Sequence, residues 1–332
     1  MTEATFTEAI EGAIADEMEL DERVFTMGTR VPPWLESRFG TARVRRTPIA
    51  ESAMTGMAVG AAGSGLRPVV LWNNLSFSFV AFDQLANQAA RIRYMFGGQR
   101  DFPIVFRGMY ATGTRSAAQH SHTGYAIYAH AGGLKIVVPS CPADAKGLLI
   151  SAIRDDNPVI VCEATRLATM TGPVGDDPIP LGVAAVRRPG ADVTVVAIGY
   201  MVEVALEAAA RAAELDIDVE VIDPRTIVPL DRETIHTSVR RTGRLVVVDE
   251  SFPICSVAAE IMAGIAEDGP TLGALRAPLQ RVCTQPVPVP FSPVLEDHVV
   301  PGVDRVLDAV RAAVSPSAAG TRRLSKENAK NT

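Results

Sequence analysis

The sequence lacks several features that would place it in a simple class of protein. Its 332 residues include four cysteines, and none of them forms a Cys-x-x-Cys pair or stands at zinc-finger spacing from a histidine, which argues against a disulfide scaffold or a zinc site. No apolar stretch reaches the ~18 residues of a membrane span, and the acidic N-terminus does not resemble a signal peptide. We therefore expect a cytoplasmic protein without a membrane segment.

The sequence also lacks the signatures of nucleic-acid and common nucleotide binding. Its formal net charge is −6, and acidic and basic residues are mixed, so no basic stripe is available for a phosphate backbone. There is no P-loop and no Gly-x-Gly-x-x-Gly between a strand and a helix. The nearest glycine-rich run, residues 60–65, follows a predicted helix and is typical of its C-terminal turn.

The sequence does contain a regular alternation of two kinds of apolar segment. Runs rich in β-branched residues alternate with stretches of helical periodicity, including one long predicted helix over residues 79–96. This alternation indicates parallel sheets covered by helices on both faces. We predict two doubly wound α/β domains, residues 1–185 with a Gly- and Pro-rich linker and residues 186–316, followed by a disordered tail over 317–332.

One acidic residue in the stretch TPIAESAMTGMAVGAA, residues 47–62, requires an explanation. Glu51 stands at the head of a predicted helix of small and apolar residues. A carboxylate there is favoured by the helix dipole by about 0.3–1 kcal/mol. Alternatively, Glu51 lies in an apolar pocket and has a specific hydrogen-bonding partner, because a buried unpaired acid is costly. The residues alone leave both explanations open.

Two histidines follow a predicted strand, in the segment AAQHSHTGY. Open α/β sheets bind ligands in the loops at the carboxyl ends of their strands, which favours a functional role for His120. A structural role is the more common one for a single histidine, and we favour it for His122.

Several separated segments resemble one family of enzymes. TPIAESAMTGMAVGAA, GLRPVV, FDQLANQAARIRYMFGGQ, PIVFRG, AQHSH, ADAKGLL and VVVDES occur in the order found in the β subunit of thiamine-diphosphate-dependent 2-oxoacid dehydrogenases, a family that includes the pyruvate, branched-chain 2-oxoacid and acetoin enzymes. The resemblance spans residues 5–313. It implies a thiamine pyrimidine-binding domain followed by a transketolase-type C-terminal domain, and an α2β2 assembly in which the α subunit holds the diphosphate and Mg2+. The absence of the Gly-Asp-Gly motif for magnesium diphosphate from this chain fits that division.

The resemblance also implies roles for individual residues. Glu51 would be the catalytic acid that hydrogen-bonds the pyrimidine ring of the cofactor, Phe77 would pack against that ring, and His120 would lie near the reacting atoms. A structural K+ ion in some members implies a site made by main-chain carbonyls, at Ile104, Ala152, Asp155 and Asn157 in this sequence.

The chain departs from the family at the edges of this expected site. Acidic residues usually follow the first strand, whereas Thr29 and Arg30 stand here and the loop to the next helix is short. Met109 and Tyr110 replace a pair that is commonly Pro-Asn, and His122 replaces a frequent glutamine. These differences affect the region expected to face the substrate and the partner subunit.

Three functions follow from these observations. The first is the β subunit of an enzyme that decarboxylates a 2-oxoacid and passes the acyl group to a lipoyl carrier on an acyltransferase. The second is a split transketolase-like carboligase, which would use the same Glu51, Phe77 and His120. The third is a non-catalytic docking subunit, which the missing acids at Thr29 and Arg30 would favour.

Overall fold

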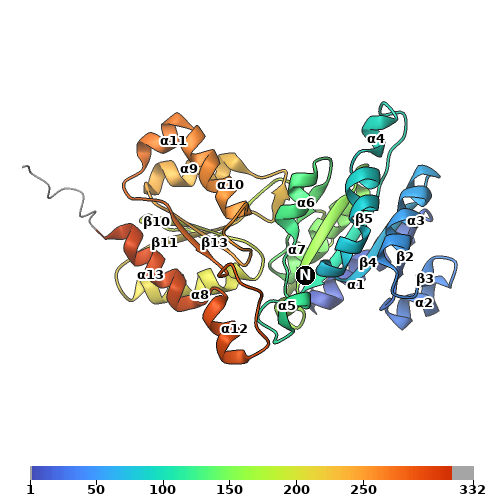
Figure 1. The fold of residues 1–332 in the computed structure, drawn as a ribbon, viewed down its shortest axis with the longest axis horizontal. Coiled ribbons are helices and arrows are strands. Elements are labelled where there is room, and N and C mark those ends of the chain that lie inside the picture. The colour runs from blue at the N-terminus through green and yellow to red at the C-terminus, as the bar shows by residue number, and fades with distance from the viewer. Residues whose placement is uncertain (1, 316–332) are drawn as a thin grey trace, which may run out of the picture.

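Two mostly parallel β-sheets organise residues 2–315, which are the residues described by a computed structural model of the chain (Figure 1). The first sheet has the strand order β12 (Thr226–Val228), β6 (Lys135–Val137), β7 (Val159–Ala164), β5 (Val105–Tyr110), β4 (Arg67–Asn74), β2 (Val24–Gly28) and β3 (Val44–Arg46). All neighbouring strands are parallel except β12, which comes from the second half of the chain and pairs antiparallel with β6. The predicted tail, residues 317–332, lies outside the described residues.

Helices cover both faces of this sheet. On one face α1 (Phe6–Leu20) packs against α7 (Pro142–Arg154), and on the other α3 (Glu51–Gly63) packs against the irregular helices that follow β4. A capping box at Thr5 begins α1, because the Glu8 amide donates to Thr5 Oγ1 (3.1 Å) and the Thr5 amide donates to Glu8 Oε2 (2.8 Å). This reciprocal pair satisfies two donors that a helix start otherwise leaves unpaired.

The prediction of one long helix over residues 79–96 is wrong. The segment instead contains the end of a 3-10 helix, η1 (Leu75–Ala81), a π-helix, η2 (Gln84–Ala89), and a short α4 (Ile92–Met95). The Leu75 carbonyl accepts hydrogen bonds from Ser78 Oγ (2.7 Å) and from the Tyr128 hydroxyl (3.0 Å). These buried hydroxyls bind the Leu75 carbonyl, which would otherwise accept the hydrogen bond of an α-helical turn. The competition favours the tighter 3-10 turn at the start of η1.

The second sheet lies beside the first. Its strand order is β14 (Gln280–Cys283), β13 (Leu245–Asp249), β10 (Val193–Ala197), β11 (Val219–Asp223) and β9 (Ala185–Arg188), of which only β9 is antiparallel to its neighbour. One group of helices that pack together is α8 (Met201–Ala213) and α13 (Val303–Val314); the other is α9 (Arg232–Thr242), α10 (Val257–Glu267) and α11 (Gly269–Ala274). The predicted fold class, two doubly wound α/β domains, is confirmed.

Short elements connect and flank the two sheets. They are α2 (Pro33–Phe39), α5 (Ala117–His120), α6 (Tyr125–Ala131), η3 (Thr165–Leu167) and α12 (Pro293–Val299), with an antiparallel ribbon of β1 (Thr2–Thr5) and β8 (Thr171–Val174). β8 falls within the segment predicted as a linker. None of the helices in residues 2–315 combines the length and the apolar character that crossing a bilayer requires.

Candidate active site

Three consecutive connections of the first sheet bring the predicted site residues to one edge. Glu51 begins α3 after β3, Phe77 lies in η1 after β4, and His120 ends α5 after β5. Because β3, β4 and β5 belong to one parallel sheet, these connections all leave from the carboxyl ends of its strands. This is the edge at which open α/β sheets bind their ligands.

Phe77 and His120 are in direct contact. Their ring centroids are 5.1 Å apart and the rings are nearly perpendicular, at 84°. Phe77 is half-buried and His120 is exposed, so the imidazole stands over the aromatic ring with a side open to solvent. The pair therefore offers an aromatic surface and a proton-carrying group at the same place.

Asn74 fixes this pair, and the sequence analysis did not identify it. The Asn74 side chain accepts a hydrogen bond from the Ser76 amide (2.9 Å) at the start of η1 and donates one to the His120 carbonyl (2.9 Å). An amide side chain can make both bonds because it carries a donor and an acceptor. The available signal was an asparagine, buried here, at the end of a strand where a new helix begins.

Glu51 has features of both explanations that the sequence left open. It is the first residue of α3, where the helix dipole favours a negative charge. It is also 5% exposed, and no hydrogen bond or ion pair to another residue of the described chain involves its carboxylate. Beneath it, the Thr55 hydroxyl donates to the Glu51 carbonyl (2.7 Å) and accepts from Trp72 Nε1 (3.1 Å), which anchors the first turn to β4. The Glu51 oxygens are not among the fully buried, unbonded side-chain atoms of the described residues, so the carboxylate stays open to a partner from outside the chain.

The short loop after β2 places a cation near the same edge. Arg30 is exposed, and the neighbouring Thr29 hydroxyl accepts a hydrogen bond from the Asn73 side chain at the end of β4. Pro33 then begins α2 at once, since a proline is well suited to the first position of a helix. The two acids that the resemblance implies here are thus replaced by a hydroxyl and a guanidinium.

His122 lies apart from the other predicted residues, in a cleft of about 1320 Å3 between the two domains. Its ring contacts Phe79 and Phe252, at centroid distances of 5.2 and 6.0 Å. Burial lowers the pKa of its imidazole below the ordinary value. Glu51, Phe77 and His120 do not line this cleft. The residues expected to do the chemistry therefore lie on an open edge of the chain.

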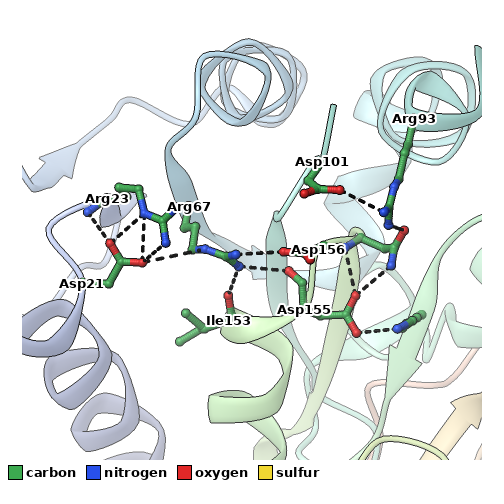
Figure 2. A network of polar contacts seen from close by, with 10 residues as sticks. Asp21, Arg23, Arg67, Arg93, Asp101, Ile153, Asp155 and Asp156 are labelled. Carbon is green, nitrogen blue, oxygen red and sulfur yellow. Dashed lines mark hydrogen bonds and ion pairs between the residues drawn. The ribbon is translucent and has the colours of Figure 1, made fainter. Parts of the chain in front are cut away.

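The main-chain turn implied as a K+ site is held by charged side chains (Figure 2). Arg67 donates to the carbonyls of Ile153 (2.9 Å) and Asp155 (3.1 Å). Burial raises the pKa of the Asp155 carboxyl, but hydrogen bonds from Lys135 and Asn157 outweigh it, so this pKa lies below its usual range. A carbonyl oxygen has two lone pairs, and the turn follows the negative end of α7. The carbonyls of Ile104, Ala152 and Asp155 already accept hydrogen bonds within the chain, that of Asp155 from the Arg67 guanidinium, and the K+ site stays a prediction.

Two family models match the chain in the order of its two domains. The model described as "Transketolase, pyrimidine binding domain" matches residues 2–170, and the model described as "Transketolase, C-terminal domain" matches residues 182–306. The first match includes Glu51, Phe77 and His120.

Curated relatives are similar over most of the chain. The "Acetoin:2,6-dichlorophenolindophenol oxidoreductase subunit beta" of Cupriavidus necator is 48% identical over 271 residues, which cover 81% of this chain and 80% of that protein. The "Pyruvate dehydrogenase E1 component subunit beta" of Rhizobium meliloti is 43% identical, covering 94% of this chain and 70% of that protein. A solved structure titled "Split gene transketolase, inactive beta4 tetramer" covers 93% of this chain and is itself covered to 97%, with a TM-score of 0.79. At 22% identity, the last likeness shows the fold alone.

Proposed function

The chain belongs to the family of transketolase-like β subunits of thiamine-dependent pyruvate and acetoin dehydrogenases, and we propose that it is the β half of an α2β2 enzyme. In this proposal the enzyme decarboxylates a 2-oxoacid and transfers the acyl group to a lipoyl carrier on an acyltransferase. The active site is shared, with the pyrimidine end of thiamine diphosphate against this chain and the diphosphate end against the α subunit.

One observation carries the proposal. Glu51, Phe77 and His120 gather at the carboxyl edge of the first sheet, but none of them lines the interdomain cleft of about 1320 Å3. Glu51 is buried and its carboxylate has no bonding partner within residues 2–315. Such an arrangement is half of a site, which a cofactor and a second chain complete.

The residues have distinct roles in this half-site. Thiamine diphosphate, when bound, would supply the nucleophilic carbon that decarboxylation of a 2-oxoacid needs. Glu51 would hold the pyrimidine ring by a hydrogen bond to a ring nitrogen and so favour the form of the ring that acts as the base. Phe77 supports the ring from one side. His120, beside Phe77, binds the substrate carboxylate or carries a proton in the later steps.

We assign Mg2+ and K+ to different subunits. We assign Mg2+ to the α subunit, because Mg2+ binds together with the diphosphate, which this proposal places against that subunit. A K+ ion would be held by the carbonyls of Ile104, Ala152, Asp155 and Asn157, where it would stabilise the turn that follows α7. It would have no part in the chemistry.

The relatives support the first of the three functions that the sequence left open. One of the curated relatives described above is named as the β subunit of an oxidoreductase and the other as the β subunit of pyruvate dehydrogenase E1, and neither is named as a carboligase. A docking subunit that had lost catalysis would have no use for a buried, unpaired Glu51. We therefore favour the dehydrogenase over the carboligase and over the docking subunit.

Co-expression with a candidate α-type subunit from the same organism tests the proposal. The complex is given thiamine diphosphate and Mg2+, and reduction of dichlorophenolindophenol is followed with pyruvate, branched-chain 2-oxoacids and acetoin. We expect cofactor-dependent reduction with at least one of them. A complex that binds the cofactor but reduces the dye with none of these substrates would favour the carboligase. A complex that does not bind the cofactor would favour the docking subunit.

A further inference from the structure

Glu296 on α12 is a buried carboxylate whose oxygens are all occupied by one loop of the other domain. Its residue is 0% exposed. Oε1 accepts a hydrogen bond from the Gly113 amide (2.8 Å), and Oε2 accepts from the Arg115 amide (2.9 Å) and from Arg115 Nη1 (3.0 Å). Figure 1 shows α12 beside α5, at the place where these bonds connect the two domains.

The loop held by Glu296, residues 111–116, leads directly to His120. The Ala111 amide donates to the His120 carbonyl (2.9 Å), and the Thr112 hydroxyl donates to the Ser121 carbonyl (2.9 Å). The backbone that carries His120 is thus bonded to the start of the loop. Any movement of the loop would be passed to His120 through these two bonds.

The loop has a backbone that needs outside support. Arg115 and Ala117 have φ values of +61° and +60°, a region that residues with a Cβ rarely occupy. Gly113 has φ +79°, and a Cβ on it would stand 2.6 Å from Arg166 Nη1. Backbone of this kind persists where surrounding contacts determine it. Here three charge-assisted hydrogen bonds to Glu296 provide those contacts.

We infer that Glu296 is a positioning residue for the reaction: from the C-terminal domain it holds the 111–116 loop so that His120 stays over Phe77 at the site. This inference rests on the proposed function, because it needs His120 to act on the substrate. Glu296 lies 176 positions from His120 in the sequence and acts only through the loop.

Glu296→Gln is the informative substitution, because a glutamine has one acceptor oxygen and turns a donor toward an amide that also donates. The matched control is Asp297→Asn. Asp297 binds the same Arg115 side chain, but its own side chain is 67% exposed, and it does not bond the loop amides. Both variants are made in the complex with the α subunit, with and without His120→Ala.

Hydrogen–deuterium exchange over residues 111–120 and steady-state dye reduction are the two readouts. We expect Glu296→Gln to speed exchange at Gly113 and Arg115 and to lower kcat by roughly 10- to 100-fold, with the affinity for thiamine diphosphate unchanged. The same substitution should cost no further kcat in the His120→Ala background. Asp297→Asn should change kcat by less than about 2-fold.

Other results would overturn the inference in distinguishable ways. Unchanged exchange in Glu296→Gln would show that the carboxylate does not hold the loop. Faster exchange with unchanged kcat, or an equal loss of kcat with and without His120, would show that it does not act through His120. Glu296→Gln could fail to assemble with the α subunit. In that case, fast exchange of the Gly113 and Arg115 amides in the unmodified complex would overturn the inference. Absence of turnover in the unmodified complex would instead contradict the proposed function itself.

Discussion

Two regions of the molecule bury a glutamate, and they do so in opposite ways. At the start of α3, Glu51 is 5% exposed and has no side-chain partner in residues 2–315, whereas on α12 Glu296 is 0% exposed and accepts three hydrogen bonds. Full burial of a carboxylate is costly without hydrogen bonds, and at Glu296 the chain itself supplies them. At Glu51 the chain supplies none, and the carboxylate oxygens are not among the fully buried, unbonded atoms of the described residues, so they stay open to a partner that comes from outside the chain.

The largest effect is expected at Glu51. In Glu51→Gln, kcat for cofactor-dependent dye reduction should fall by about 10²- to 10⁴-fold, because an acid–base group is removed. Stability of the chain without cofactor should stay the same or rise, since no hydrogen bond to the carboxylate is lost and a buried charge is removed. Steady-state kinetics measures kcat, and thermal unfolding measures the stability of the chain without cofactor. A large loss of stability with little loss of kcat would give Glu51 a structural role like that of Glu296.

The second-largest effect is expected at His120. His120→Ala should lower kcat by roughly 10- to 100-fold, because the imidazole touching Phe77 is removed. His130→Ala is the matched control, as this histidine is exposed and lies on α6 away from the carboxyl edge. Dye reduction over a range of 2-oxoacid concentrations separates kcat from KM. Equal activities of the two variants would remove His120 from the site.

Another of the buried glutamates, Glu250, extends the comparison to a group whose titration can be measured. Glu250 is 3% exposed, its oxygens accept no hydrogen bond within the described residues, and Arg166 Nη1 is 3.6 Å away. Burial raises the pKa of its carboxyl to about 7. The folded state therefore holds this proton up to a higher pH than the unfolded state does. Stability from this group is complete below the unfolded pKa of roughly 4.5 and is lost as the pH rises through 7.

Glu250→Gln removes this titration. Measured by chemical denaturation, the free energy of unfolding of the variant relative to the unmodified chain should increase from pH 5 to pH 8, by about 3 kcal/mol at most. Subtracting the unmodified chain cancels the titration of all other groups. A relative stability that does not change with pH would show that Glu250 keeps its charge and is paired as Glu296 is.

The smallest expected effect is at Asn74, where a neutral side chain does the bonding. Asn74→Ala should lower the free energy of unfolding by about 1–2 kcal/mol, because the Ser76 amide and the His120 carbonyl each lose a bond. Asn87→Ala is the control, since this side chain is exposed and bonds only Asp83 and Arg91. Similar unfolding free energies for the two variants would contradict the bracing role given to Asn74.

The sequence predicted what depends on neighbouring residues and on the resemblance. The alternation of strands and helices and the helix that begins at Glu51 rest on local patterns, and they are confirmed. The resemblance identified Phe77 and His120, which the structure brings into contact, although their roles stay predictions.

What the sequence did not predict depends on contacts between distant segments. The 3-10 helix η1, whose end takes the first residues of the predicted long helix, is bonded at Ser78 to Tyr128, 50 residues away. β12 joins the first sheet from the second half of the chain, and Glu296 meets Gly113 across 183 residues. Periodicity and capping patterns extend over a few turns, so they carry no information about such pairs.

We propose that Glu51 has no partner in its own chain because it binds and activates the pyrimidine of thiamine diphosphate. The most direct test is the rate at which the thiazolium C2 proton of the bound cofactor exchanges with deuterium, in the complex with the α subunit. We expect Glu51→Gln to slow this exchange by at least about 10²-fold while the cofactor stays bound. Equal exchange rates in the two complexes, at equal occupancy, would contradict it.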